Sequence, residues 1–455
     1  MYRYRQFPAS FQSRRVVKMS TSRSALSTDL EASTLRKLQA RIIPFVFVLM
    51  VIAFLDRINI GFAALTMNKD LAITSQQFGL LSGIFFWGYF IFEIPSNLML
   101  HKVGARIWIA RILISWGIVA MLTGFVQTAA HLYVVRFLLG VAEAGYFPGI
   151  LLYLTYWFQR RQLAHAAALF LTAIPIANIV GAPLSGVILD HIHWFGVSSW
   201  RWLLVLEGIP AIVGGILTYW LLPARPADAK FLTTEERNYI TAELGREEQQ
   251  KVKHRITVFQ TLSHARVWQL TSIYFGAMIG QYTMTFWMPQ LIKAISSTYS
   301  NTTIGVLVMI PYVAALAAMI LVGRSSDRRL ERRYHGAIPL TIGALSLVML
   351  STSKTSSVFL TIALWSLTAS AISSLMGPFW SLPNEFLMGY SAAAGIAFIN
   401  CFGNLGGFVG THAMGAIIKT TGSFRGGLLS AGVAWFISAA LLIALPKRTE
   451  MHAAA

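Results

Sequence analysis

Long apolar runs separated by short polar segments dominate the pattern of the chain. A helix needs about twenty mainly apolar residues to cross a bilayer, and twelve such runs can be counted, six on each side of a long polar segment. The first six cover residues 42–65, 78–100, 106–126, 132–156, 165–189 and 201–222, and the second six cover 267–292, 303–322, 336–352, 356–378, 391–417 and 425–445. The pattern predicts an all-α membrane protein of twelve transmembrane helices in two pseudo-symmetric six-helix halves.

The polar segments divide the chain into five parts. These are a disordered cytoplasmic tail (1–40), an N-terminal half (41–222), a cytoplasmic linker (223–265), a C-terminal half (266–446) and a short cytoplasmic tail (447–455). Within the linker, Thr233 and Glu236 have the Thr-x-x-Glu spacing of a capping box. We therefore expect a short amphipathic helix there, lying on the membrane surface.

Basic residues in alternate loops predict the orientation of the chain. Lys and Arg are enriched in the loops that face the cytoplasm, and the connection after the second span holds Lys102 and Arg106. Arg160 and Arg161 follow the fourth span, and five arginines lie between 324 and 333, after the eighth. Both termini and the linker should face the cytoplasm from the plasma (inner) membrane. No apolar segment with a cleavage site, as in a signal peptide, opens the chain.

Composition excludes several classes of protein. With 55% hydrophobic and 12% charged residues and a mean hydropathy of +0.60, the chain does not suit a soluble globular protein, and we expect lipid around it. The net charge of +19 is spread over short loops, so no nucleic-acid partner is expected. Cys401 is the single cysteine, and no motif of a metal centre, nucleophile or phosphate-binding loop occurs. We predict a monomer without cofactor or metal that is not an enzyme.

A loop pattern repeats between the two halves. Residues 323–328 read GRSSDR, a Gly-x-x-x-Asp-Arg pattern that should join the eighth and ninth spans. The corresponding segment of the first half, residues 96–106, reads SNLMLHKVGAR, with His101 in place of the Asp. Matching loops in two six-span halves indicate an internal duplication.

These loops resemble the motif of the major facilitator superfamily, and Arg136 to Ala144, RFLLGVAEA, resembles its Arg-x-x-x-Gly motif. The stretches LDRINIGFAALTMNKDL (55–71), EIPSNLMLHKVGARIWIARI (93–112) and GVAEAGYFPGILLYLTYWF (140–158) are similar to the anion:cation symporter family, nearest to bacterial tartrate and related organic-anion permeases. The resemblance implies the major facilitator fold and secondary active transport.

Four charged residues within apolar runs are the leading functional candidates. Asp56 and Arg57 lie inside the first span, where each charge costs about 2.5 to 3.5 kcal/mol at the bilayer centre. Arg136 and Glu143, seven residues apart, share one face of the fourth span with Gly140. Because a carboxylate in a poorly hydrated cavity binds protons readily, Asp56 and Glu143 are the proton-coupling candidates, and the resemblance implies the same. Arg57 and Arg136 stay charged and should bind a carboxylate.

Further residues are assigned to substrate binding and to gating. The resemblance implies that Tyr89, Trp380 and Asn400 contact substrate, whereas Gln281 and Tyr282 are candidates from position alone. The predicted gating residues are Glu93, Lys102, Arg106, Asp327 and Arg328, with Glu93 paired to loop arginines. The second half has polar donors but almost no charge inside its spans, so the first half should handle protons and the second should shape the site to the substrate.

The predicted function is import of a small organic anion with protons by alternating access of the two halves. The anion is a tartrate-like hydroxy acid, a sugar acid or another carboxylate, and the coupling ion is H+, with Na+ as the alternative. An efflux antiporter is the alternative function, because residues 181–186, GAPLSG, partly resemble a motif of exporters.

Overall fold

The computed structural model describes residues 29–251, 263–352, 357–383 and 390–446, and in this part of the chain every regular element is helical. The predicted tails at 1–28 and 447–455 lie outside the described residues. The N-terminal half contains α2 (Ile43–Asp70), α3 (Ser75–Val103), α4 (Ala105–Thr123), α5 (Ala129–Glu143), α6 (Tyr146–Thr155), α7 (Arg160–Leu171), α8 (Ala173–His191) and α9 (Ser199–Leu221). The C-terminal half contains α12 (Ala265–Ile295), α13 (Asn301–Arg329), α14 (Arg333–Thr352), α15 (Val358–Ser381), α16 (Tyr390–Thr421) and α17 (Arg425–Ile443).

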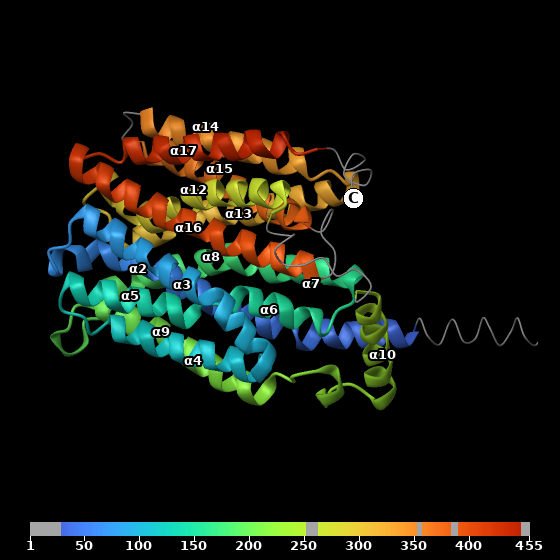
Figure 1. Cartoon of the computed structure of the whole chain (residues 1–455). Helices are drawn as coiled ribbons and strands as arrows, with labels where there is room; N and C mark the ends of the chain where they lie inside the picture. The colour runs from blue at the N-terminus through green and yellow to red at the C-terminus, as the bar shows by residue number, and fades with distance from the viewer. Residues whose placement is uncertain (1–28, 252–262, 353–356, 384–389, 447–455) are drawn as a thin grey trace, which may run out of the picture.

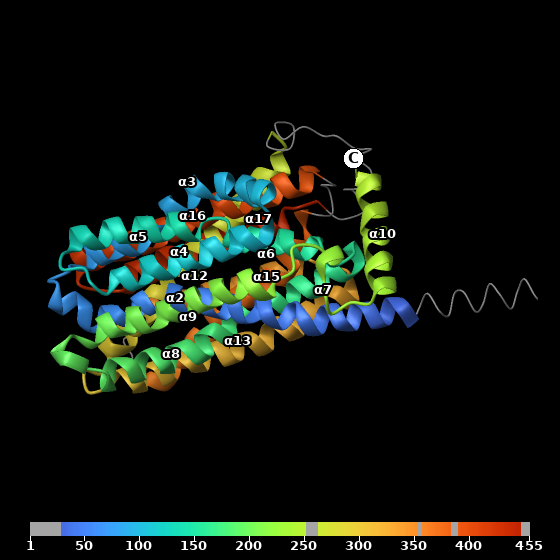
Figure 2. The same cartoon turned by 90° about the horizontal axis from the view of Figure 1, so that it is seen from below.

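The helices form two side-by-side groups with roughly parallel axes (Figures 1 and 2). Each of the twelve predicted runs falls on one helix or on a broken pair, α5 with α6 and α7 with α8. Within the described residues, ten helices are long and apolar enough to cross a membrane. The other two, α12 and α16, have 31 and 32 residues. The all-α membrane architecture predicted from the apolar runs is confirmed.

A polar helix lies across one end of the bundle. This helix, α10 (Thr234–Lys251), belongs to the linker. The described part of the chain also begins and ends at this end of the bundle, here called the linker end (Figures 1 and 2). The predicted capping box is confirmed, because Thr233 N donates to Glu236 Oε2 at 2.8 Å and Glu236 N donates to Thr233 Oγ1 at 3.2 Å.

The prediction of disorder before the first span is wrong for residues 29–40, which are helical. Glu236 holds this helical segment against α10, since its carboxylate accepts hydrogen bonds from Ser33 Oγ at 2.7 Å and Lys37 Nζ at 2.8 Å. A polar segment that finds partners on the linker can thus keep helical structure outside the membrane.

The fourth span is broken in its middle. α5 ends at Glu143 and α6 begins at Tyr146, and between them Gly145 has a φ of +82°. A residue with a Cβ would be strained in this left-handed conformation, and its Cβ would lie 2.5 Å from Ser96 Oγ. The break places Glu143 at a helix end inside the bundle.

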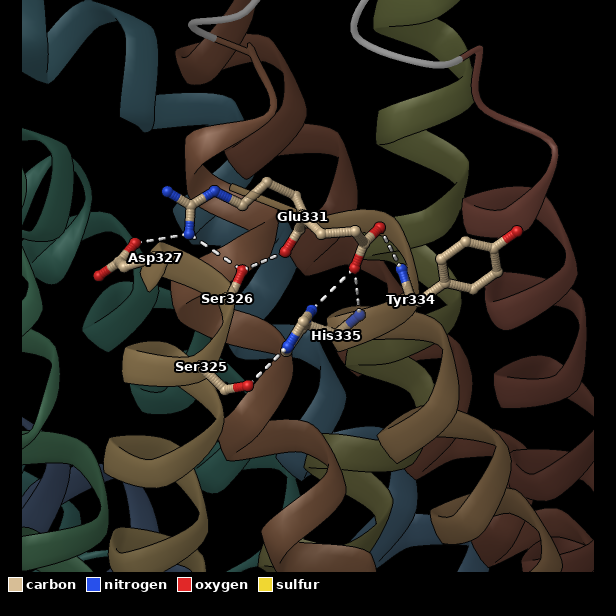
Figure 3. A network of polar contacts seen from close by, with 7 residues as sticks. Ser325, Ser326, Asp327, Glu331, Tyr334 and His335 are labelled. Carbon is tan, nitrogen blue, oxygen red and sulfur yellow. Dashed lines mark hydrogen bonds and ion pairs between the residues drawn. The ribbon is translucent and has the colours of Figure 1, made fainter. Parts of the chain in front are cut away.

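The GRSSDR motif differs from its prediction as a connecting loop. α13 continues to Arg329, so the motif forms the last turns of that helix (Figure 3). Arg332 then donates to Asp327 Oδ1 at 2.6 Å and to Ser326 Oγ at 3.0 Å. Glu331 accepts bonds from the Tyr334 and His335 amides at 2.8 and 3.1 Å, which caps the start of α14. Polar side chains that bond locally let the helix extend beyond its apolar run.

The two halves meet mainly where α3 packs on α16, α8 on α13 and α2 on α12, with a smaller contact between α7 and α15. At the end opposite the linker, here called the far end, the backbones approach closely, since a Cβ on Gly79 of α3 would lie 3.1 Å from the Gly415 Cα of α16. Asp190, near the end of α8, accepts four hydrogen bonds of 2.7 to 3.1 Å from the amides and side chains of Asn301 and Thr302. These contacts close the far end.

Candidate functional site

A cavity of about 860 Å³, including its part open to solvent, lies between the halves. Its wall is contributed by α2, α3, α6, α7, α8, α12, α13, α15 and α16, and most of the lining side chains are apolar or aromatic. Among the described residues that line it, Arg57 is the one with a full charge. This lining, mostly apolar with a few polar groups and one charge, is typical of a small-molecule site.

Arg57 is bonded to both halves. One guanidinium nitrogen forms an ion pair with Glu143 at the end of α5, and the other donates to the Tyr282 hydroxyl of α12 at 3.1 Å. Its Cζ lies 5.1, 5.4 and 5.5 Å from the ring centroids of Phe54, Phe85 and Tyr89, within the range of cation–π attraction. This aromatic surround holds one planar cation at the cavity wall.

A chain of polar contacts continues from Arg57 through the second half and returns to the first. The Tyr282 hydroxyl donates to Asn404 Oδ1 at 3.4 Å, and Asn404 Nδ2 donates to Asn400 Oδ1 at 3.1 Å. Asn400 Nδ2 donates to Glu93 Oε1 of α3 at 2.6 Å. Two carboxylates of the first half, Glu143 and Glu93, are therefore connected through Arg57 and three neutral side chains of the second half.

Arg136 and Glu143 are both buried, with 2% and 1% of their surface exposed, but neither lines the cavity. The Arg136 Cζ lies 5.4 Å from the Phe85 ring centroid, and the guanidinium interacts electrostatically with Glu143 and Asp56. The structure thus separates the two predicted anion-binding arginines, with Arg57 at the cavity wall and Arg136 behind it.

Asp56 also lies behind the wall, and its neighbourhood contains a residue that the sequence analysis missed. Its Oδ1 accepts a 3.4 Å bond from Asn59, and it interacts electrostatically with Glu207 of α9. Glu207 is 3% exposed and accepts a 2.8 Å bond from Ser185. The energetic cost that singled out Asp56 applies equally to this carboxylate, which lies inside the sixth apolar run. The sequence alone could therefore have identified Glu207 as a candidate.

Tyr89, Gln281, Tyr282, Trp380 and Asn400, all predicted to contact substrate, line the cavity. The Trp380 ring lies 5.0 Å from that of Tyr274 and 6.5 Å from that of Phe147, so aromatic contacts also cross between the halves. Gln281 donates to Thr285 Oγ1 at 3.2 Å. The structure brings these five side chains together with Arg57.

The predicted gating residues lie outside the wall of the cavity. The expected pairing of Glu93 with loop arginines is wrong, because its carboxylate is buried and bonded to Asn400. Asp327 pairs with Arg332 of its own half, and Arg106 lies 5.5 Å from the Tyr219 ring centroid. Lys102 and Arg328 are exposed. Polar bonds that join the halves come instead from Asp190, Arg57 and Glu93. Further bonds across the halves link Asn68 to Gln290, Gln76 to Lys419, and the Cys401 thiol to the Phe90 carbonyl oxygen.

Comparisons with known proteins identify the family of this chain. Residues 46–411 match the family model of the Major Facilitator Superfamily. A putative tartrate transporter of Agrobacterium vitis is 46% identical over 94% of this chain and 96% of its own length. A quinolone resistance transporter of Acinetobacter baumannii is 35% identical over 92% and 94%.

Among solved structures, a bacterial homologue of the human lysosomal transporter Spinster, in an inward-facing and occupied conformation, has the same fold. Its TM-score is 0.68 at 16% identity, over 89% of this chain and 96% of that one. The chain therefore belongs to the major facilitator superfamily, and it is a multi-pass membrane transport protein rather than an enzyme.

Proposed function

We propose that the protein imports a small organic anion together with protons. The observation that carries this proposal is Arg57, the one charged side chain in the described wall of the cavity, held there by Glu143. A guanidinium suits a carboxylate because it offers planar, paired donors. The similarity to a putative tartrate transporter supports an anion as the substrate.

Protonation of Glu143 would couple the two ions. While Glu143 is ionised, it neutralises Arg57 and competes with any external carboxylate for the same nitrogens. A proton on Glu143 removes that competition and leaves an unbalanced positive charge at the cavity wall, which an organic anion can then balance. For a singly charged anion the loaded carrier has the same net charge as the empty one. The barrier to rearranging a low-dielectric core is therefore higher when only one of the two ions is bound.

Neutral donors of the second half would recognise the rest of the substrate. Tyr282, Gln281 and Asn400 offer hydroxyl and amide groups to the cavity opposite Arg57. Hydroxyl groups of a tartrate-like or sugar acid would find partners there, and Trp380 would pack against the carbon skeleton. We infer that the substrate is a hydroxylated carboxylate.

The closed far end then corresponds to one state of alternating access. With the linker and both termini on the cytoplasmic side of the inner membrane, as the basic loops predict, the contacts of Asp190 and Gly79 seal the external side. In that orientation the path from the cavity to the outside is closed. Rocking of the halves would break those contacts and open the cavity outward.

An efflux antiporter is the second candidate, favoured by the GAPLSG segment and by the similarity to a quinolone resistance transporter. In α8 this segment packs on α13, since a Cβ on Gly186 would lie 2.4 Å from the Asn301 carbonyl oxygen. Close helix packing thus accounts for its final glycine without any role in direction.

Uptake in right-side-out proteoliposomes tests the proposal. With an inward proton gradient, radiolabelled tartrate should accumulate above its external concentration, and a protonophore should abolish the accumulation. Accumulation driven by a sodium gradient at constant pH would replace the coupling ion. Tartrate or a quinolone leaving preloaded vesicles against its own gradient in exchange for protons would favour the antiporter.

A further inference from the structure

A charged residue lies on the outer side of α4, a helix at the edge of the bundle (Figure 1). This residue is Arg111, and on the same side Ile107, Ile114 and Ile118 recur at helical spacing. Ile107 and Ile118 are 44% and 46% exposed, as expected of side chains that face lipid acyl chains. An arginine among them is costly in the hydrocarbon core, so it needs a partner or a function.

A groove runs beside Arg111, where α4 packs on α9. Its volume is about 670 Å³, including the part open to the surroundings. Arg111, Ser115 and the three isoleucines of α4 line it, together with Tyr219 of α9. The two helices pack closely here, since a Cβ on Gly215 would lie 3.0 Å from the Ala110 carbonyl oxygen. The groove is therefore a crease on the outer surface of a close helix pair.

The Arg111 guanidinium is held along α4 and forms no ion pair with any described residue. Its Cζ lies 4.0 Å from the Trp108 ring centroid, and its Nη1 donates to Ser115 Oγ at 3.4 Å. Ser115 lies four residues further from the start of the helix, so the side chain is not extended towards the membrane surface, as a snorkelling arginine would be. The remaining N–H groups of Arg111 can donate to an external anion.

The depth of Arg111 suits a lipid head group. α4 has 19 residues, about 28 Å at 1.5 Å per residue, which just spans a hydrocarbon core. Arg111 lies six residues after Ala105, about 9 Å from the start of α4 at the linker end. Arg106 lies closer to that end, with its Cζ 5.5 Å from the Tyr219 ring centroid. Tyr219 thus brings a second guanidinium to the linker end of the groove.

The second half has no such charge. α14 packs on α17 as α4 packs on α9, so the two helix pairs correspond between the halves. Between Gly336 and Thr352, α14 contains no charged residue. A helix in this position therefore does not need an arginine on its outer side in order to pack, and Arg111 requires a separate explanation.

We propose that the groove between α4 and α9 binds an anionic phospholipid. Its phosphate would accept paired hydrogen bonds from Arg111, with Arg106 as a second cation, because guanidiniums match phosphate oxygens in geometry and charge. One acyl chain would lie along the three isoleucines, which extend over about 16 Å of α4. Basic residues between transmembrane helices near a membrane surface are typical of sites for anionic head groups. The lipid is neither substrate nor coupling ion, so this site is tested independently of the proposed function.

Lipid binding by the purified protein tests the site. The protein in a neutral detergent is titrated with dioleoylphosphatidylglycerol or dioleoylphosphatidylcholine, which share their acyl chains but differ in net charge. Mass spectrometry of the intact complex measures occupancy by the first bound lipid. The wild type should bind phosphatidylglycerol at least about tenfold more tightly, and Arg111→Leu should remove this preference. Leucine suits a lipid-facing position, so the variant should fold, and thermal unfolding without lipid checks this.

Two further variants separate the groove from general surface charge. Arg329→Leu removes an exposed charge at the end of α13, outside the groove, and should leave the preference unchanged. Ile118→Trp fills the groove but keeps Arg111, and it should weaken binding of phosphatidylglycerol by about fivefold or more.

Three results would overturn the proposal. Equal binding of the two lipids by the wild type, or an equal loss in Arg111→Leu and Arg329→Leu, would leave Arg111 with no specific role. Unchanged binding in Ile118→Trp would exclude the groove as the site of the acyl chain. A rise in melting temperature with sodium phosphate as large as that with phosphatidylglycerol would mean that Arg111 binds a free anion and not a lipid.

Discussion

The two halves share one architecture but differ in what they bury. Within the described residues, the membrane-spanning core of the N-terminal half buries five charged side chains, Asp56, Glu93, Arg136, Glu143 and Glu207. The buried polar side chains of the C-terminal half, such as Thr283, Asn400 and Asn404, are neutral. The helices of the two halves correspond, so the difference was introduced by side chains on a common scaffold.

The difference also determines how the halves communicate. At the cavity, the charged half reaches the neutral half through Arg57 to Tyr282 and through Glu93 to Asn400. Both second-half partners belong to one hydrogen-bonded chain through Asn404. A change of charge at Glu143 would therefore be transmitted to the second half through Arg57, and the following predictions test this division.

The largest effect should come from removing the cavity-wall cation. Arg57→Ala should lower tartrate uptake by about 100-fold or more, because a buried ion pair that loses one partner costs roughly 2 to 5 kcal/mol. The variant should also melt at lower temperature, since Glu143 remains buried without its partner. Uptake in proteoliposomes and thermal unfolding of the purified protein provide the two measurements.

A double variant serves as the control. Arg57→Ala with Glu143→Gln removes both charges, and it should recover most of the thermal stability without recovering uptake. If Arg57→Ala alone transports within threefold of the wild type, Arg57 does not anchor the anion, and the comparison between a charged and a neutral half loses its functional meaning.

Most of this architecture could be predicted from the sequence, because long apolar runs and the cost of buried charge are local properties. These properties predict the twelve runs and the positions of Asp56, Arg57 and Glu143 inside them. The extension of α13 to Arg329 was not predictable from hydropathy, since it depends on local bonds such as that of Arg332 to Asp327.

Contacts between residues far apart in the sequence were the main feature that could not be predicted. Arg57 and Tyr282 are separated by 225 positions, and Glu93 and Asn400 by 307. A single sequence shows that burying Glu93 costs free energy, but it does not show which neighbour compensates for that cost. The predicted partner, an arginine in a loop, was therefore wrong, and the partner is Asn400. Glu207 was missed although its signal was local, because it lies outside the motifs of the resemblance.

The next largest effect should come from the closure of the far end. Asp190→Ala removes four hydrogen bonds between the halves, and bonds to a charged group contribute about 1.5 to 3 kcal/mol. The outward-open state should become at least about tenfold more populated. A cysteine at Thr285, which lines the cavity, should then react correspondingly faster with an impermeant thiol reagent from outside, in a Cys401→Ser background.

Asp70→Asn is the matched control for this closure. Asp70 also lies at the far end, but its carboxylate accepts a 2.9 Å bond from Trp200 of its own half. Labelling should stay at the wild-type rate in this variant. Equal acceleration in both variants would mean that general loosening, and not the inter-half contact, controls access.

A smaller effect is expected where the neutral half meets Arg57. Tyr282→Phe removes the 3.1 Å hydrogen bond but keeps the ring, so the KM for tartrate should rise by about threefold to tenfold, equivalent to roughly 0.7 to 1.4 kcal/mol. Tyr312→Phe is the control, because Tyr312 also lines the cavity but lies on another helix, α13, while the hydroxyl that bonds Arg57 is that of Tyr282. A rise confined to Tyr312→Phe would contradict the assignment.

The smallest effect should lie outside the membrane, at Glu236. Burial opposes ionisation there, but hydrogen bonds from Lys37, Thr233 and Ser33 outweigh it and lower the pKa of Glu236 from 4.5 to about 2. Because the pKa of Glu236 is lower in the folded protein, ionised Glu236 stabilises the docked linker. This stabilisation is complete above about pH 4.5 and is lost as the pH falls towards 2. Hydrogen exchange of residues 29–41 should therefore accelerate over this interval, while that of the cavity helices changes less.

Glu236→Gln should reproduce the faster exchange at pH 7, because the amide cannot form the ion pair with Lys37. Glu243→Gln is the matched control, since Glu243 lies on the same helix and pairs with Arg246 one turn away. Tartrate uptake should fall by less than about twofold in both variants, because neither residue contacts the cavity. A loss of uptake in Glu236→Gln as large as that in Tyr282→Phe would contradict this prediction. It would show that the linker, and not only the charged and neutral halves, takes part in the change between inward- and outward-open states.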